Sequence, residues 1–136
     1  LQLLFNNVDI ADIGDAGGIQ NSAAAGSLYV ALHTADPGEA GTAATNETAY
    51  TNYARVAVAR TAGGWTVSGN AVNNTAQVTF PQCGVTGATL TYGSITTASS
   101  GASKIIYSGA LSTSLPVADQ ITPFFAAGTG ITVTED

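Results

Sequence analysis

Hydrophobic residues alternate with polar or small residues in several short stretches of the chain. In residues 28–34, for example, Leu28, Val30 and Leu32 share one face of an extended strand. The same two-residue period, separated by turn-forming Gly, Pro, Asn and Ser, recurs in residues 53–61, 65–67, 76–80, 89–97, 104–108, 121–125 and 131–134. The pattern predicts an all-β protein, with a single antiparallel β-sandwich of the jelly-roll type.

The inward positions of these strands predict the hydrophobic core. The expected core residues are Leu28, Val30, Leu32, Val56, Val58, Trp65, Val78 and Phe80. Gly69 and Asn70 both tolerate positive φ and lie between extended segments, so they predict the turn of a β-hairpin.

The first 26 residues follow a different pattern. Leu1, Leu4 and Phe5 have helical spacing, whereas the following residues to position 26 are rich in Asp, Gly, Ser and Ala. We therefore expect an N-terminal arm of residues 1–26, with one helical turn, and a β-sandwich domain of residues 27–136. An apolar tip on such an arm needs cover, so the expected partner-contact residues are Leu1, Leu4, Phe5, Ile10 and Ile13.

Charge is scarce in this chain and narrows the possible partners. Only 9% of the 136 residues are charged, three of them basic, and the net charge is −6. Nucleic-acid binding requires a Lys and Arg surface that is lacking here, and no apolar run reaches the ~20 residues of a membrane span. A surface of Thr, Ser and Ala suits contact with other protein, so we expect a homo-oligomer, either a dimer or a trimer.

Few residues suggest catalysis or metal binding. The single histidine, His33, lies inside a predicted strand, and no nucleophile-elbow motif accompanies it. The loop carboxylates are Asp36, Glu39 and Glu47. The arm carries Asp9, Asp12 and Asp15 at a spacing of three, which is not the spacing of an EF-hand calcium loop. We assign no catalytic residue, metal ligand or cofactor, and expect that the protein is not an enzyme.

The aromatic residues have two alternative interpretations. Trp65, Tyr29, Tyr53 and Tyr92 could stack on sugars in a receptor-binding site, but aromatic residues in alternating strands more often belong to a core or a subunit contact.

An ordered series of sequence strings is more specific. The strings are SLYVALHTADPGEAG (27–41), YARVAVAR (53–60), GWTVSGN (64–70), VTFP (78–81), YSGAL (107–111) and ITPFFAAG (121–128), with IGDAGG (13–18) before them. The series resembles a family of small virion structural proteins of tailed bacteriophages, commonly labelled tail fibre or capsid decoration protein. The resemblance implies an all-β, non-enzymatic component of the virion, assembled in the bacterial host cytoplasm.

Two functions are compatible with this resemblance. The first is a capsid decoration or cement protein that stabilises the head by binding the major capsid protein or another virion protein, and it is favoured by the short length and low charge. The alternative is a tail-fibre or receptor-binding component that adheres to the host surface. The absence of fibrous repeats in the sequence makes this the second choice.

Overall fold

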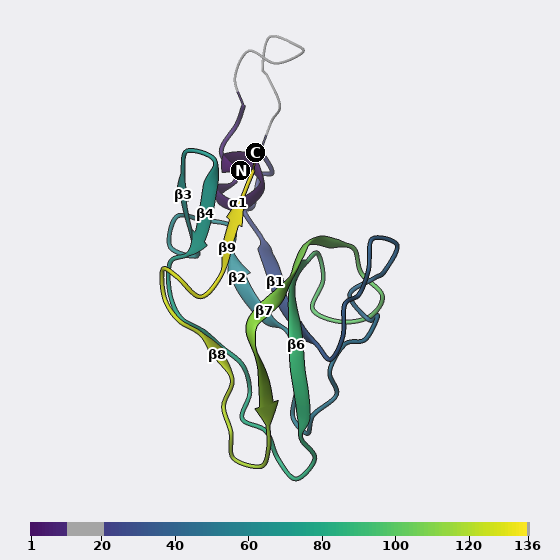
Figure 1. Cartoon of the computed structure of the whole chain (residues 1–136). Coiled ribbons are helices and arrows are strands. Elements are labelled where there is room, and N and C mark those ends of the chain that lie inside the picture. Colours follow the sequence, from purple (N-terminus) through teal and green to yellow (C-terminus); the bar gives the residue numbers. More distant parts are fainter. Residues whose placement is uncertain (11–20, 136) are drawn as a thin grey trace. The chain divides into compact units, whose positions relative to one another are not determined.

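The computed structural model describes residues 1–10 and 21–135 (Figure 1). Its elements are α1 (Gln2–Asn6), β1 (Ser27–His33), β2 (Val56–Ala59), β3 (Trp65–Ser68), β4 (Ala71–Asn74), β5 (Val78–Thr79), β6 (Ala88–Thr96), β7 (Ile105–Val117), β8 (Phe124–Phe125) and β9 (Thr132–Thr134). The strands form a four-stranded sheet in the order β2-β1-β6-β7, a three-stranded sheet in the order β3-β4-β9, and the pair β5-β8. The predicted all-β, antiparallel fold class is confirmed.

Contacts along the chain define two compact units. Unit 1 comprises Leu1–Ser27, Val58–Val78 and Phe125–Asp136, and unit 2 comprises Leu28–Ala57 and Thr79–Phe124. The described part of the predicted arm therefore belongs to the same unit as β3, β4 and β9. Within the described residues, no helix has the length and apolar character to cross a membrane.

The central strands of unit 2 are β1 and β6, which pair antiparallel with Val30 opposite Ile95 and Ala31 opposite Ser94. Because side chains alternate between the two faces of a strand, Val30 and Ile95 share one face while Ala31 and Ser94 share the other. All four are buried. This sheet is therefore covered on both faces at its centre.

The edge strand β7 pairs with β6 through an irregular ladder. Leu90 lies opposite Leu115 and Tyr92 opposite Ala110, so residues 111–114 face Thr91 alone. Such a bulge bends the strand and interrupts its free edge, which discourages pairing with another sheet. Pro116 in this strand also has no backbone N–H to donate.

In unit 1, β3 and β4 form a hairpin in which Ser68 lies opposite Ala71. The predicted turn at Gly69 and Asn70 is confirmed, and Gly69 has a φ of 59°. The helix α1 packs on β3, where the rings of Phe5 and Trp65 meet in an edge-on, T-shaped arrangement with a centroid distance of 4.9 Å. Both side chains are fully buried.

The predicted core is confirmed at six of its eight positions. The buried residues are Leu28, Val30, Leu32, Trp65, Val78 and Phe80. Val56 and Val58 are partly exposed instead, because β2 is an edge strand of the four-stranded sheet.

Candidate functional site

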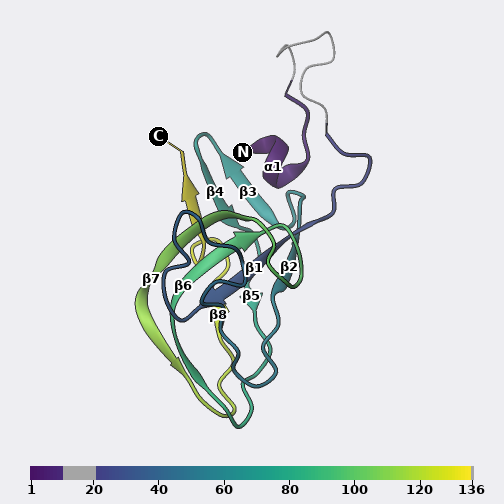
Figure 2. The same ribbon diagram turned by 90° about the vertical axis from the view of Figure 1, so that its right-hand side faces the viewer.

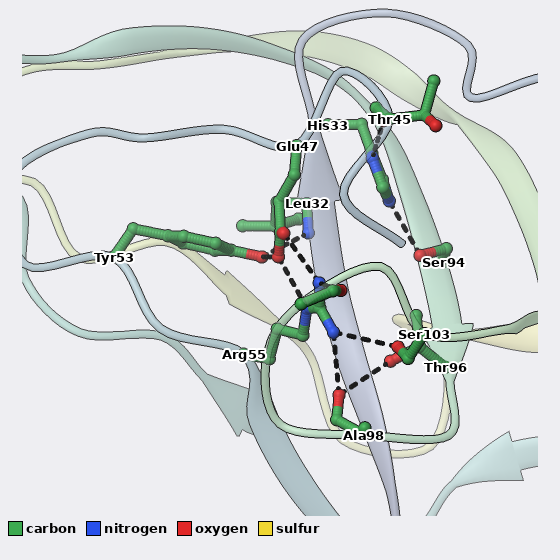
Figure 3. Close-up of polar contacts among 11 residues, drawn as sticks. Leu32, His33, Thr45, Glu47, Tyr53, Arg55, Ser94, Thr96, Ala98 and Ser103 are labelled. Atoms are coloured by element: carbon green, nitrogen blue, oxygen red, sulfur yellow. Dashed lines mark hydrogen bonds and ion pairs between the residues drawn. The ribbon is translucent and has the colours of Figure 1, made fainter. Parts of the chain in front are cut away.

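Unit 2 contains a polar cluster centred on Arg55 and Glu47 (Figure 3). The Arg55 guanidinium donates to both carboxylate oxygens of Glu47, with Nε–Oε1 at 2.6 Å and Nη2–Oε2 at 2.7 Å. The Arg55 side chain is 1% exposed and that of Glu47 is 18% exposed. This planar, two-bond pairing combines charge and geometry in a site largely shielded from water.

The remaining donors of Arg55 bind the segment that connects β6 to β7. Nη1 donates to Ala98 O at 2.9 Å and to Ser103 Oγ at 3.0 Å, and Nη2 donates to Gly101 O at 2.7 Å. The hydrogen bond to Glu47 raises the pKa of Arg55 further above its already high value. The guanidinium is therefore a permanent charged clamp on this loop.

Tyr53 extends the cluster to β1. Its hydroxyl donates to Glu47 Oε1 at 2.9 Å and accepts from the Leu32 N–H at 3.0 Å. The Leu32 amide thus bonds a side chain instead of a strand backbone, since β2 begins only at Val56. Burial raises the pKa of Tyr53, so the hydroxyl keeps its proton and remains a donor to Glu47.

His33 anchors the segment that follows β1. Its Nδ1 lies 2.9 Å from Thr45 O and its Nε2 lies 2.7 Å from Ser94 Oγ. Because a carbonyl only accepts, Nδ1 carries the proton and Nε2 accepts from the Ser94 hydroxyl. Burial lowers the pKa of His33, which favours this neutral tautomer.

The His33–Ser94 contact has the geometry of a base beside a nucleophile, but its surroundings do not suit catalysis. His33 is fully buried, Ser94 is 4% exposed, and the third partner is the carbonyl of Thr45 in place of a carboxylate. A substrate could not reach Ser94 without opening the sheet. The pair therefore fixes loop structure.

These contacts hold two loops, residues 34–46 and 97–104, which we call the two-loop surface. The loops bond directly through Ala43 N to Ser103 O at 2.9 Å, and the second loop closes through Thr97 N to Lys104 O at 3.1 Å. Its exposed residues are Thr34, Ala35, Asp36, Gly38, Glu39, Ala40, Ala44, Asn46, Thr97, Ser99, Ser100, Gly101, Ala102 and Lys104. Such ordered surface loops on a sheet are where binding residues are often found in proteins.

Residues 14–134 match the family described as Podophage GP4 fiber I protein gp80. The chain belongs to this phage fibre family. No curated protein matches the chain.

Membership of the fibre family confirms the resemblance to tailed-phage virion structural proteins. It favours the tail-fibre alternative over capsid decoration, the function that the sequence placed first.

The predicted partner-contact residues lie in unit 1 of this fibre-family chain, except Ile13, which lies outside the described residues. Phe5 is fully buried against Trp65, so its surface is already covered within the unit. Leu1, Leu4 and Ile10 are partly exposed. Their contact with a partner stays a prediction.

The basic residue that holds α1 in place escaped the sequence analysis. Arg60 Nε donates to Leu4 O and Nη2 donates to Leu3 O, both at 2.6 Å, and Nη1 donates to Ala25 O at 3.0 Å. A cation at the end of a helix satisfies carbonyls that have no partner within it. Arg60 therefore fastens the helix to its unit.

The remaining candidates have local roles or are distant from any cluster. Asp36 Oδ1 accepts from Gly38 N at 2.8 Å, and Asp9 Oδ1 accepts from Asn21 N at 2.6 Å. Asp12 and Asp15 lie outside the described residues. Among residues 1–10 and 21–135, no group of three or more His, Cys, Asp or Glu side chains could hold a metal ion. Trp65 is fully buried and offers no face to a sugar.

Proposed function

We propose that this protein is a tail-fibre component of a phage virion that adheres to the host surface through the two-loop surface, without catalysis. The observation that carries the proposal is that both loops are anchored, residues 97–104 by Arg55 and residues 34–46 by His33, in a chain of the fibre I family. Binding to an outer-surface receptor costs less when the loops are already ordered.

The chemistry of the two-loop surface suits a neutral, hydroxyl-rich receptor. Its exposed residues are mostly small, and Ser99, Ser100 and Asn46 provide hydroxyl and amide groups. Asp36 and Glu39 outnumber Lys104, so a strongly anionic receptor is disfavoured. The absence of an accessible nucleophile beside His33 supports adhesion over cleavage.

Adsorption measurements test this proposal. Phage carrying Ser99→Trp should adsorb to host cells at least tenfold more slowly, whereas Thr113→Trp, a change at another exposed position, on β7, should leave the rate unchanged. Equal adsorption of both variants would show that another surface contacts the host.

Immunolabelling distinguishes the proposed function from capsid decoration. Antibody against the protein should bind the tails of intact virions. Label distributed over the heads would overturn the fibre assignment and restore the decoration hypothesis.

A further inference from the structure

A groove of about 470 Å³ lies between α1 and β3 in unit 1. Figure 2 shows the helix beside this strand, which is an edge strand of the three-stranded sheet. The lining residues are Gln2, Asn6, Val8, Thr61, Ala62, Trp65, Thr66 and Val67. We call it the α1–β3 groove.

The hairpin register determines which backbone groups face the groove side of β3. Ser68 and Ala71 flank a two-residue turn and so form a hydrogen-bonded pair, as do Thr66 and Asn73 two residues further on. The bond from Thr75 N to Gly64 O at 2.9 Å continues this alternation. The N–H and C=O groups of the intervening residues, Trp65 and Val67, therefore point away from β4.

At Trp65, one of these two residues, the outward backbone N–H and C=O already form hydrogen bonds within the chain. Trp65 N donates to Thr61 O at 2.9 Å, and Trp65 O accepts from the Asn6 amide at 3.0 Å in the orientation that satisfies both polar atoms of Asn6. The next outward position along the edge is Val67. No bond to its N–H or C=O exists within the described part of the chain.

The chemistry of the residues that line the groove limits the kind of molecule that can bind there. None of the eight lining residues is charged, and Val8, at the groove, is 49% exposed. The outward N–H and C=O of Val67 match the hydrogen-bonding groups of a peptide, whereas the buried Trp65 ring cannot stack on a sugar. An extended, uncharged peptide backbone fits these groups best.

A second copy of the same edge does not fit. Each copy carries its own α1 beside β3, so two identical edges would meet helix against helix before their strands could pair. The occupant must therefore present a strand with no such wall. In a chain with a net charge of −6, an acidic segment is also disfavoured.

We propose that the α1–β3 groove binds an extended, uncharged segment of another virion protein, which pairs with β3 at Val67 and so attaches this chain to the particle. The identity of the partner as a virion protein rests on the proposed fibre function. The groove assigns attachment to unit 1, while the two-loop surface of unit 2 contacts the host.

A matched pair of proline variants tests this assignment. Val67→Pro removes the outward N–H of β3 and leaves the bonds to β4 intact, because proline is tolerated where an edge N–H faces away from the sheet. Thr134→Pro makes the same change at the opposite edge, since Val133 pairs with Val72 and the N–H of Thr134 points outward from β9. Copies of the protein per purified particle are then counted by quantitative mass spectrometry.

We expect Val67→Pro to reduce the copy number at least tenfold and Thr134→Pro to leave it unchanged. Ala62→Trp, which fills the groove without altering the backbone of β3, should reproduce the loss if Val67→Pro fails to fold. If the Ala62→Trp protein folds and is present on purified particles at the unmodified copy number, the proposal is overturned.

Cross-linking identifies the occupant. A photoreactive amino acid placed at Thr66 should cross-link, in assembled particles, to one segment of a different virion protein. A cross-link only to a second copy of this chain, or none at all, would overturn the proposal.

A binding assay separates this inference from the proposed function. Purified Ala62→Trp protein should still bind host cells as the unmodified protein does. If it binds particles normally but loses binding to purified host polysaccharide, the groove is a receptor site and the attachment proposal fails. If the unmodified protein binds no host cells, the proposed function fails while the attachment result stands.

Discussion

Replacement of Arg55 by methionine should destabilise the protein more than any exposed ion-pair change would. Arg55→Met keeps much of the apolar stem but removes five hydrogen bonds, two to Glu47 and three to the 97–104 loop. It leaves a largely buried Glu47 carboxylate without its cation. Removal of one partner from a buried ion pair typically costs about 3–5 kcal/mol of unfolding free energy.

Urea unfolding followed by far-UV circular dichroism measures this loss, with tyrosine fluorescence as a second probe. Arg55→Lys is the matched control, because a single ammonium cannot bond Glu47 in two places and reach the loop carbonyls as well. We expect it to lose less than Arg55→Met but more than ~1 kcal/mol. A loss below about 1 kcal/mol for Arg55→Met, as for an exposed pair, would refute the role of the clamp.

Three further predictions concern Trp65, His33 and Arg60. Trp65→Ala should cost about 3–5 kcal/mol in urea unfolding. Trp65→Phe should cost clearly less, because the buried Nε1 has no hydrogen-bond partner among the described residues. Burial lowers the pKa of His33 below its ordinary value of 6.5, so the unfolded chain binds the proton first. Above pH 6.5 the unfolding free energy should therefore not depend on His33. Below that pH it should decline by at most ~1.4 kcal/mol per pH unit because of this group, and His33→Gln should remove that part of the pH dependence. Arg60→Ala should speed hydrogen exchange in residues 2–6, measured by mass spectrometry, and leave β6 protected; equal exchange in α1 would contradict its fastening role.

The strands could be predicted because their signal is local. Alternation at Leu28, Val30 and Leu32 fixes both the strand and its buried face, and the turn at Gly69 follows from backbone freedom within two residues. The partial exposure of Val56 and Val58 could not be predicted in the same way. It depends on which strand lies at the edge of the sheet, and strand order is not encoded in the period of a single strand.

The helix at the N-terminus shows the same division between local and non-local information. Spacing of Leu1, Leu4 and Phe5 predicts a helical turn, which the structure has as Gln2–Asn6. Its attachment to β3 through Phe5 and Trp65 joins residues sixty positions apart, roughly half the chain. Composition around Asp9 predicted an arm that contacts a partner, and it carried no signal for the contact that holds α1 within unit 1, because that contact is distant in sequence.

The polar cluster was missed although the sequence carries a signal for it. Arg55 and Arg60 stand within strand-like sequence in a chain with only three basic residues. An arginine within a predicted strand is expected to have a hydrogen-bonding or charged partner inside the protein, because the free-energy cost of removing its charge from water must be offset. The identity of that partner was hidden, because Glu47 reaches Arg55 only after the loop between them has folded.

Internal use of the arginines also sets the electrostatic character of the surface. Arg55 is committed to Glu47 and to loop carbonyls, and Arg60 to the carbonyls beside α1, which leaves Lys104 as the exposed basic residue of the three. Exposed acids such as Asp36 and Asp119 have no comparable number of cations nearby. The two arginines therefore stabilise their units and, by the same bonds, leave the surface acidic. We expect a fibre chain built in this way to discriminate against polyanionic partners, because the arginines that would attract them are bound to groups within the chain.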